Sequence, residues 1–332
     1  MGIPDASVEA LLCERLTDDL SGLRIATVPC RSPSAGELLI RVRAAGVAFP
    51  DVLMARGLYQ HRPVLPFVAG MEAAGEVAAI GTGVANFAID ERVCVVLRSG
   101  AIAESIVVPA SQVRQIPGGL DFAHSAAFHT GALTAYVALV RRALLVRGET
   151  LLVHGATGGV GVAAVQLGLH LGAHVIATGT SDEKLAFVKS LGAHHVLNTT
   201  SGFKDAVKSL TEGRGADVVF DPVGGDILDE SLRCIAWGGR LLVIGFAGGR
   251  IATIPSNIPL IKGFAVIGVR AGEYGRRDPV KGRENVEAID RLVSGGVMVP
   301  HIHTRVPFRQ ALDAYRIIIE RRMFGRVVIE FG

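Results

Sequence analysis

The chain has 332 residues, 49% hydrophobic and 20% charged, with a formal net charge of +3. This length exceeds that of a typical single domain, so two domains with ample cores are expected. The small, dispersed charge, without basic blocks or interleaved aromatic residues, argues against a nucleic-acid partner. No apolar run reaches the ~18 residues of a membrane span. Residues 1–7 lack the regions of a signal peptide. We therefore expect no membrane partner and a cytoplasmic location, and we expect the four isolated cysteines to be reduced thiols.

The N-terminal part, residues 10 to 120, is expected to be all-β, with short strands at 37–43, 73–79, 92–97 and 103–108 separated by Gly, Pro and Asp turns. A helical stretch from about Ser125 to Val146 follows. Strands and helices then alternate, which predicts a parallel sheet covered on both faces. Its expected strands are 151–154, 174–178, 196–197, 218–221, 240–245 and 264–268.

The C-terminal part is predicted to contain a helix at 283–294, a short strand at 301–305, a helix at 308–321 and a strand at 325–331. Because no helix follows the last strand, we expect this strand to return to the N-terminal β domain.

A glycine-rich turn, His154-Gly-Ala-Thr-Gly-Gly-Val-Gly161, lies between an apolar strand and an apolar helical stretch. Its spacing is not the strict GxGxxG, but its place in a βαβ unit is that of the dinucleotide-binding fingerprint. Gly155 permits a tight turn, Gly158 and Gly159 allow close approach of a pyrophosphate, and Gly161 lets the helix pack against the strand. The helix N-terminus adds free N–H groups and a partial positive charge. The motif therefore predicts a nucleotide cradle.

The end of the second strand of this unit favours NADPH over NADH. NAD-specific folds place an Asp or Glu there to bind the ribose 2′-hydroxyl, whereas this strand ends at Thr178-Gly179-Thr180. Ser181 is an expected helix N-cap, and Lys184 in the first turn can meet a 2′-phosphate as a point charge. The alternative is a solvated Lys184 in an ordinary first turn.

Several motifs together resemble the medium-chain dehydrogenase/reductase superfamily in order and spacing. They are Gly46-Val-Ala-Phe-Pro-Asp51, Gly57-Leu-Tyr59, Pro66-Phe-Val-Ala-Gly-Met-Glu72, the run 154–161, Gly192-Ala193, Asp221-Pro-Val-Gly-Gly225 and Gly238-Gly-Arg240. Within it the chain resembles the zinc-independent NADPH:quinone oxidoreductases of the zeta-crystallin type. The resemblance implies an α/β protein with a GroES-like β domain (1–126 and 271–332) and a Rossmann doubly wound parallel-sheet domain (127–270). It also implies oligomers, and we expect a homodimer.

No metal is expected. The alcohol dehydrogenase branch would carry a Cys near Ala48 and a His before Glu72, but this chain has Ala48 and Met71, and the clustered cysteines of the structural zinc lobe are missing. His301-x-His303 could form a ligand pair, but two such residues in a short strand are more simply neighbours on one face. His129 is expected to be a packing or hydrogen-bonded residue, with a place at the active site as the alternative.

The resemblance also implies site residues. Quinone reductases usually have Asn where Ala48 stands, so Asp51 and Tyr59 are the remaining catalytic candidates. A Tyr hydroxyl, with a pKa of ~10, can donate a hydrogen bond or a proton to a developing enolate or hydroquinone oxygen; alternatively, Tyr59 only caps its loop. The expected cofactor contacts are Gly158, Gly159 and Val160 at the pyrophosphate, Thr178, Ser181 and Lys184 at the 2′-phosphate end, Val223 on the adenosine side, Gly245, Phe246, Ala247, Val269 and Arg270 along the nicotinamide, Thr134 beneath it, and Arg326.

We therefore expect an NADPH-dependent oxidoreductase that transfers a hydride to a quinone or another electron-poor carbonyl acceptor without a metal. One alternative is an enoyl thioester or 2-alkenal double-bond reductase. Another, suggested by Ala48, is an NADPH-binding structural or sensor protein whose catalysis has faded. The loops 55–65 and 270–282 carry no pattern that identifies the acceptor.

Overall fold

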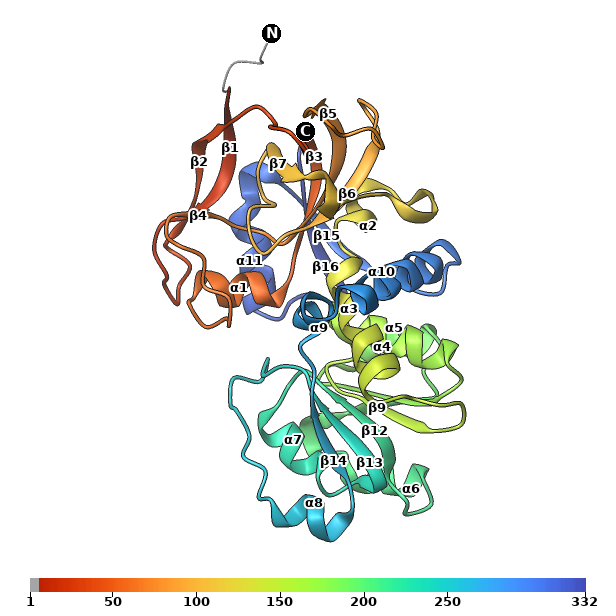
Figure 1. Ribbon diagram of the computed structural model, residues 1–332. Helices are drawn as coiled ribbons and strands as arrows, with labels where there is room; N and C mark the ends of the chain where they lie inside the picture. Colours follow the sequence, from red (N-terminus) through yellow and green to blue (C-terminus); the bar gives the residue numbers. More distant parts are fainter. Residues whose placement is uncertain (1–5) are drawn as a thin grey trace. The chain divides into compact units, whose positions relative to one another are not determined.

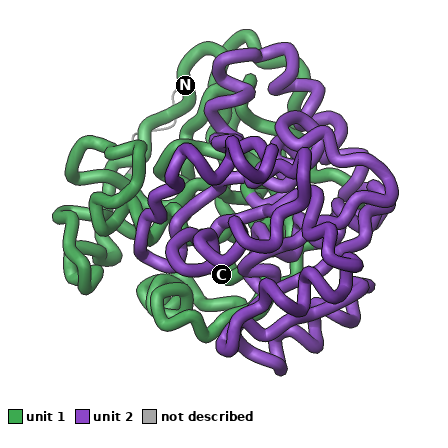
Figure 2. Tube along the Cα trace, turned by 90° about the horizontal axis from the view of Figure 1, so that it is seen from below, with its two compact units in different colours: residues 1–130, 300–332 green, residues 131–299 purple. Residues whose placement is uncertain are grey.

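A computed structural model describes residues 6–332 and divides into two units (Figures 1 and 2). Unit 1 comprises the residues up to Thr130 together with Pro300–Gly332, and unit 2 comprises Gly131–Val299. The expected fold class, α/β with a β domain and a parallel-sheet domain, is confirmed. Residues 1–5, which contributed to the expectation that a signal peptide is lacking, lie outside the described residues.

Unit 1 is built on a seven-stranded sheet and a three-stranded sheet. The larger sheet has the order β15-β16-β3-β5-β6-β8, with β7 also paired to β3; the smaller has the order β2-β1-β4. The strands are β1 (Ala6–Cys13), β2 (Leu23–Cys30), β3 (Glu37–Val47), β4 (Phe67–Val68), β5 (Glu72–Ile80), β6 (Arg92–Val96), β7 (Ser105–Pro109), β8 (Val113–Gln115), β15 (Ile302–Pro307) and β16 (Arg326–Glu330).

The final strand returns to the N-terminal domain, as predicted. β16 pairs antiparallel with β3, with Val327 opposite Val47. Val327, Ile329 and Leu38 are fully buried in one apolar core. Helix α11 (Ala311–Ile319) packs on this core through Tyr315, which is also fully buried. The C-terminal residues are therefore part of the interior of unit 1.

Short helices connect these strands. They are α1 (Phe49–Ala55), α2 (Phe122–Ser125) and α3 (His129–Tyr136), the last of which begins in unit 1 and continues into unit 2. A π-helical segment, η3 (Val137–Arg142), follows α3. The short 3-10 segments of the chain are η1 (Ala110–Gln112), η2 (Pro117–Gly119), η4 (Thr199–Ser201) and η5 (Phe308–Gln310).

Unit 2 contains a six-stranded, all-parallel sheet with the order β11-β10-β9-β12-β13-β14. The strands are β9 (Thr150–Val153), β10 (His174–Gly179), β11 (His195–Asn198), β12 (Ala216–Asp221), β13 (Ile235–Val243) and β14 (Ala265–Gly268). The helices are α4 (Gly159–His170), α5 (Asp182–Ser190), α6 (Lys204–Leu210), α7 (Gly225–Ser231), α8 (Asn257–Lys262), α9 (Ala271–Arg277) and α10 (Pro279–Ser294). All four residues of β9 are buried, as expected for a central parallel strand.

The chain returns to unit 1 at Pro300, later than the expected residue 271. Helices α9 and α10 belong to unit 2 because they pack beside η3. The Arg141 guanidinium of η3 donates hydrogen bonds to the Asn285 amide oxygen and the Glu284 carboxylate of α10, each at 2.8 Å. Between residues 6 and 332, every helix is too short or too polar to cross a lipid bilayer. No disulfide bond joins the cysteines in the part of the chain that the structure describes.

Candidate functional site

The glycine-rich turn between β9 and α4 has the geometry of a cradle. Gly155 has a φ of 55°, a left-handed conformation that favours glycine. A Cβ on Gly161 would lie 2.2 Å from the Gly155 carbonyl oxygen and 2.6 Å from the Ala156 Cα. Only glycine at position 161 therefore lets α4 start this close to the turn, as the sequence predicted.

The first turn of α4 presents free backbone donors. The N–H of Gly158, expected at the pyrophosphate, bonds instead to the Gly155 carbonyl at 3.0 Å. The helical pattern begins with the N–H of Val162, which bonds to the Gly158 carbonyl at 2.8 Å. In the described part of the chain, the N–H groups of Gly159, Val160 and Gly161 donate to no backbone carbonyl. Three adjacent donors at a helix N-terminus fit a pyrophosphate.

A buried hydrogen-bond network is centred on His154, the residue directly before the cradle. The His154 imidazole is fully buried, with Nδ1 2.8 Å from Thr178 Oγ1 and Nε2 2.8 Å from Ser231 Oγ. Burial lowers the pKa of His154 to about 3, so the ring is neutral. Ser231 Oγ donates to the Ile227 carbonyl, which leaves His154 Nε2–H as the donor to Ser231. The Thr178 side chain, expected at the 2′-phosphate end, is used in this network and is 1% exposed.

The end of β10 carries the two residues expected at a 2′-phosphate, Ser181 and Lys184. Ser181 caps α5, with its Oγ accepting from the Lys184 N–H at 3.4 Å, as predicted. Lys184 is half-buried in the first turn. The nearest carboxylate beyond the strand, that of Asp182, accepts a hydrogen bond from the Asn198 amide at 2.8 Å. No acid stands at the strand end itself, where NAD-specific folds place one.

The remaining expected cofactor residues of unit 2 are brought together at the carboxyl edge of the same sheet. Val223 follows β12, the segment 245–247 follows β13, and Val269 and Arg270 follow β14. The Ala247 N–H bonds to the Pro222 carbonyl at 3.0 Å, and the Gly248 N–H bonds to the Val223 carbonyl at 2.8 Å, so the two loops are fixed to each other. The chain order reverses direction across the sheet between β9 and β12, the switch point at which such folds bind dinucleotides.

Helix α3 contributes to this edge within unit 2. A Cβ on Gly131 would lie 3.0 Å from the Gly159 carbonyl oxygen, so α3 approaches the start of α4 closely. Thr134, one turn further along α3, is half-buried.

The expected catalytic residues lie in unit 1. Tyr59 follows α1 in an irregular loop, is half-buried and packs against the core of unit 1. Asp51, in the first turn of α1, is only 2% exposed, and its Oδ2 accepts from the Ala48 N–H at 2.8 Å. Burial raises the pKa of Asp51 to about 7. Asp51 is therefore held in the interior beside the residue that precedes α1.

Arg326, an expected cofactor contact, is engaged inside unit 1. Its side chain is buried, and its guanidinium forms an ion pair with Glu72. Glu72 also accepts from the Thr130 N–H, at 2.7 Å, through its other carboxylate oxygen. This pairing follows from the burial of Glu72, because a buried carboxylate requires a cation beside it. The contact of Arg326 with the cofactor stays a prediction.

The possible ligand pair His301 and His303, and also His129, contact neighbouring protein side chains. His301 and His303 both pack on the Phe324 ring, with centroids 4.8 and 4.9 Å away. His129 is buried, and its Nδ1 lies 2.9 Å from an Arg114 guanidinium nitrogen; burial and this cation lower its pKa. Within residues 6–332 no group of three or more His, Cys, Asp or Glu side chains is arranged to hold a metal ion.

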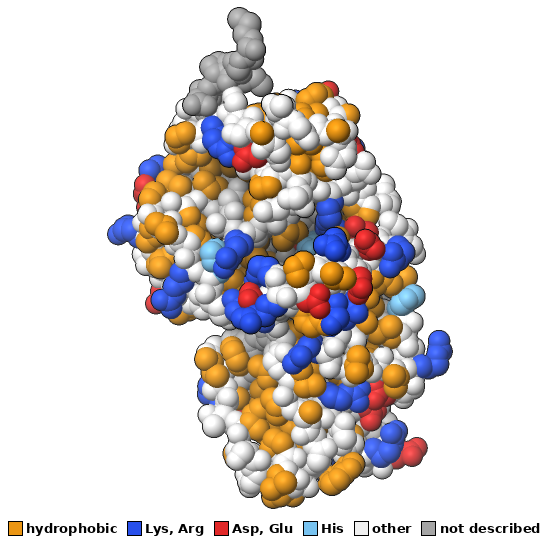
Figure 3. Space-filling model, viewed as in Figure 1, with side chains coloured by type: hydrophobic (Ala, Val, Ile, Leu, Met, Phe, Trp, Pro, Cys, Tyr) orange, Lys and Arg blue, Asp and Glu red, His pale blue; other side chains and the backbone are white. Residues whose placement is uncertain are grey.

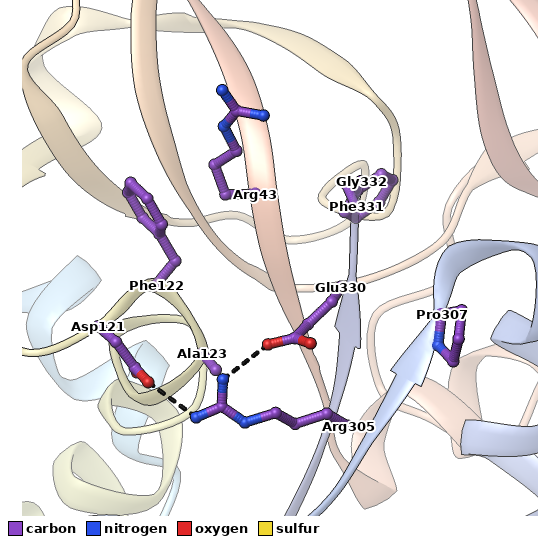
Figure 4. Close-up of a pocket in the computed structure, with 9 residues that line it drawn as sticks. All are labelled: Arg43, Asp121, Phe122, Ala123, Arg305, Pro307, Glu330, Phe331 and Gly332. Atoms are coloured by element: carbon purple, nitrogen blue, oxygen red, sulfur yellow. Dashed lines mark hydrogen bonds and ion pairs between the residues drawn. The ribbon is translucent and has the colours of Figure 1, made fainter.

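A pocket of about 500 Å³ in unit 1 contains none of the expected site residues (Figure 4). Its Arg305 guanidinium bonds to the carboxylates of Asp121 and Glu330 at 2.7 and 2.8 Å. Arg43, also on the pocket wall, pairs with Glu76. These charges are satisfied by one another, so this pocket is not the candidate active site.

The sequence did not predict two features beside the expected site residues. They are the His154–Thr178–Ser231 network and the Glu72–Arg326 pair. The sequence signal for the Glu72–Arg326 pair is a single charged residue in an apolar strand, because a buried charge requires a partner. The identity of the partner is not in the local pattern.

A Rossmann sheet with a glycine cradle at its switch point, in one chain with a GroES-like β unit, defines a class of nucleotide-dependent oxidoreductases. Two family models match the chain: "Alcohol dehydrogenase GroES-like domain" over residues 34–118 and "Zinc-binding dehydrogenase" over residues 159–289. The chain belongs to the medium-chain dehydrogenase/reductase superfamily, with quinone oxidoreductase-like relatives.

Relatives agree in length as well as in sequence. "Quinone oxidoreductase-like protein 2 homolog" of Nematostella vectensis is 37% identical over 88% of this chain and 81% of its own length. "2-haloacrylate reductase" of a Burkholderia species is 31% identical, covering 90% and 92%. A mycobacterial protein solved in complex with NADPH has a TM-score of 0.89 and 30% identity, covering 97% and 99%. The fold and its nucleotide-cofactor site are therefore those of an oxidoreductase.

Proposed function

We propose that this protein is an NADPH-dependent reductase that transfers a hydride to a quinone or another electron-poor carbonyl acceptor. The observation that carries the proposal is the cradle, where the first free N–H groups of α4 stand at the switch point of the sheet. The structural neighbour with bound NADPH and the quinone oxidoreductase-like relatives support it.

The residues of unit 2 fit NADPH. Gly159, Val160 and Gly161 would hold the pyrophosphate through their N–H groups, and Ser181 and Lys184 would hold the 2′-phosphate. The loops after β12, β13 and β14 would line the remainder of the cofactor. When bound, NADPH supplies the hydride, while the chain orients the reactants and excludes water.

Tyr59 is our proposed donor to the acceptor oxygen. Transfer of a hydride to a conjugated carbonyl places negative charge on that oxygen, and a phenol hydroxyl can donate to it. Ala48 cannot contribute a side-chain hydrogen bond. The half-buried position of Tyr59 leaves part of its side chain accessible.

A second candidate is the reduction of a C=C bond conjugated to a carbonyl or carboxylate group. The relative named 2-haloacrylate reductase favours it, because its name describes an acceptor of this kind. Parallel steady-state assays with a quinone, a 2-alkenal and a crotonyl thioester separate the candidates by their kcat/KM values. Tight NADPH binding without turnover of any acceptor would favour the sensor alternative instead.

We further propose that the reaction needs no metal. Ala48 and Met71 stand where the zinc-dependent branch would carry ligands, and neither side chain is a Zn²⁺ ligand. Full activity after chelation, with no stoichiometric metal by elemental analysis, is the expected result.

We also propose a cytoplasmic homodimer formed through unit 2. Among the described strands, β14 lies at the edge of its sheet and pairs with β13 alone. Its sequence Ala-Val-Ile-Gly has no charge to prevent further pairing. Exposed hydrophobic side chains gather beside it, over β14 and α8 (Figure 3): Trp237, Leu260 and Ile261 are 80%, 80% and 66% exposed. A second copy fits best because two identical edge strands can pair antiparallel about a twofold axis.

A further inference from the structure

Three charged side chains from distant parts of the sequence are buried in unit 1. Asp51 of α1, Glu72 of β5 and Arg326 of β16 are 2%, 2% and 4% exposed. Buried charges are costly unless they are paired. One arginine neutralises one carboxylate, so the cluster carries one uncompensated negative charge when both acids are ionised.

The two carboxylates hold the first residues of two helices. Glu72 accepts from the Thr130 N–H at 2.7 Å, at the start of α3, and its second oxygen pairs with Arg326. Asp51 accepts from the Ala48 N–H at 2.8 Å, directly before α1. α1 leads into the loop of Tyr59, and α3 carries Thr134. The cluster therefore fixes the starts of both segments that carry proposed site residues.

Asp51 and two other side chains of unit 1 each have a buried polar atom without a hydrogen-bond partner in the described structure. These atoms are Asp51 Oδ1, Arg326 Nε and the Tyr315 hydroxyl oxygen. Burial raises the pKa of Asp51. The hydrogen bond from the Ala48 N–H and the charge of Arg326 lower this pKa, and Glu72 raises it. Burial raises the pKa of Tyr315 on α11, and Asp51 and Cys13 on β1 raise it further. At the start of α3, His129 lies beside the charged Arg114, and burial together with this cation lowers the pKa of His129.

We propose that Glu72 and Arg326 are positioning residues for the reduction, and that Asp51 holds an exchangeable proton that sets the charge of this buried unit. With the proton on Asp51, the cluster of Asp51, Glu72 and Arg326 is neutral. Without it, a negative charge lies beside the starts of α1 and α3. The kinetic consequence rests on the proposed function, but the proton itself does not.

The proton is tested directly by infrared spectroscopy of the full-length protein across a pH titration. A buried protonated carboxyl has a C=O band distinct from that of a carboxylate. The band should titrate near neutral pH and be absent in Asp51→Asn, whose amide oxygen can still accept from Ala48. Glu72→Gln should shift the midpoint down, and Arg326→Met should shift it up, each by about one pH unit or more.

The double variant Glu72→Gln/Arg326→Met keeps the test decisive if Arg326→Met alone does not fold. It removes one charge of each sign, so the midpoint should return towards that of the wild type. Glu76→Gln is the matched control, because Glu76 lies on the same strand and pairs with Arg43 in a partly exposed ion pair. It should leave the midpoint unchanged.

The kinetic readout is the pH profile of kcat/KM for the acceptor, which should follow the same order of midpoints while NADPH affinity stays constant. A carboxyl band that persists in Asp51→Asn, or shifts of Glu72→Gln and Arg326→Met in the same direction, would overturn the proposal. If no acceptor is reduced, the proposed function fails, whereas the infrared titration still decides the proton on Asp51.

Discussion

Glu72 and Arg326 lie 254 positions apart and form an ion pair in the interior of unit 1. β5 and β16 reach this contact because both pair with β3, on its opposite sides. The last strand of the chain thus supplies the cation for a carboxylate that holds the start of α3. The interior of the β unit is therefore completed only when its C-terminal strand has returned.

Lys184 should discriminate between the two nicotinamide cofactors. Lys184→Ala is expected to weaken NADPH binding by ~1.5–3 kcal/mol, the scale of a charge-assisted hydrogen bond, and to leave NADH binding almost unchanged. Titration calorimetry with both cofactors measures this. Lys189→Ala on the same helix is the control, because the Lys189 ammonium donates to the Ala193 and His194 carbonyls. Equal losses for NADPH and NADH in Lys184→Ala would remove its assignment to the 2′-phosphate.

Two glycines of the cradle should respond differently to alanine. Gly161→Ala places a Cβ 2.2 Å from the Gly155 carbonyl oxygen, so we expect a loss of stability of ~1–3 kcal/mol and of NADPH binding. Gly158→Ala makes only an ordinary 3.5 Å contact with the same oxygen. It should remain nearly as stable but bind NADPH ~10-fold or more weakly, equivalent to ~1.4 kcal/mol, because its Cβ meets the pyrophosphate. Thermal unfolding with calorimetry separates the two, and unchanged NADPH affinity in both variants would contradict the cradle.

Tyr59→Phe should lower kcat and kcat/KM together by ~10- to 1,000-fold, the range for the loss of one donor that acts in the transition state. Cofactor affinity should not change. The effect should be larger for an enone, whose enolate needs protonation, than for a quinone, whose reduced form is a stabilised anion. Wild-type rates on both acceptors, with hydride transfer rate-limiting, would show that Tyr59 is only a loop residue.

Val266→Lys should convert the proposed dimer into a monomer. Val266 lies on the edge strand β14 and is 41% exposed, and a lysine on an edge strand opposes pairing with another strand. Sedimentation velocity measures the change. Val64→Lys, at an 88% exposed loop position of unit 1, should remain a dimer. A dimer that survives Val266→Lys would place the interface elsewhere.

Local patterns predicted the Rossmann unit well. The cradle and each strand of the parallel sheet could be placed because their signals are local. Apolar segments alternate along the chain, and the tight turn requires glycine at positions such as 155 and 161. The return of β16 could be inferred because no helix follows it.

Long-range partners could not be predicted in this way. β1 and β2 were not anticipated as separate strands, and they form a small sheet with the two-residue strand β4. Arg326 was expected to contact the cofactor, and its ion pair with Glu72 could not be predicted because Glu72 is far away in the chain. The crossing to unit 1 at Pro300 likewise depends on the packing of α10 against η3.

The central claim, hydride transfer from NADPH, is tested most directly by a single turnover with NADPH deuterated at the transferred C4 position. The protein and labelled NADPH are mixed with excess enone or excess quinone, and NADPH oxidation is followed against unlabelled cofactor. We predict oxidation that depends on the acceptor and slows with the label, and deuterium bound to carbon in the reduced enone if that acceptor is used. Bound NADPH that stays reduced with both acceptors would contradict the account.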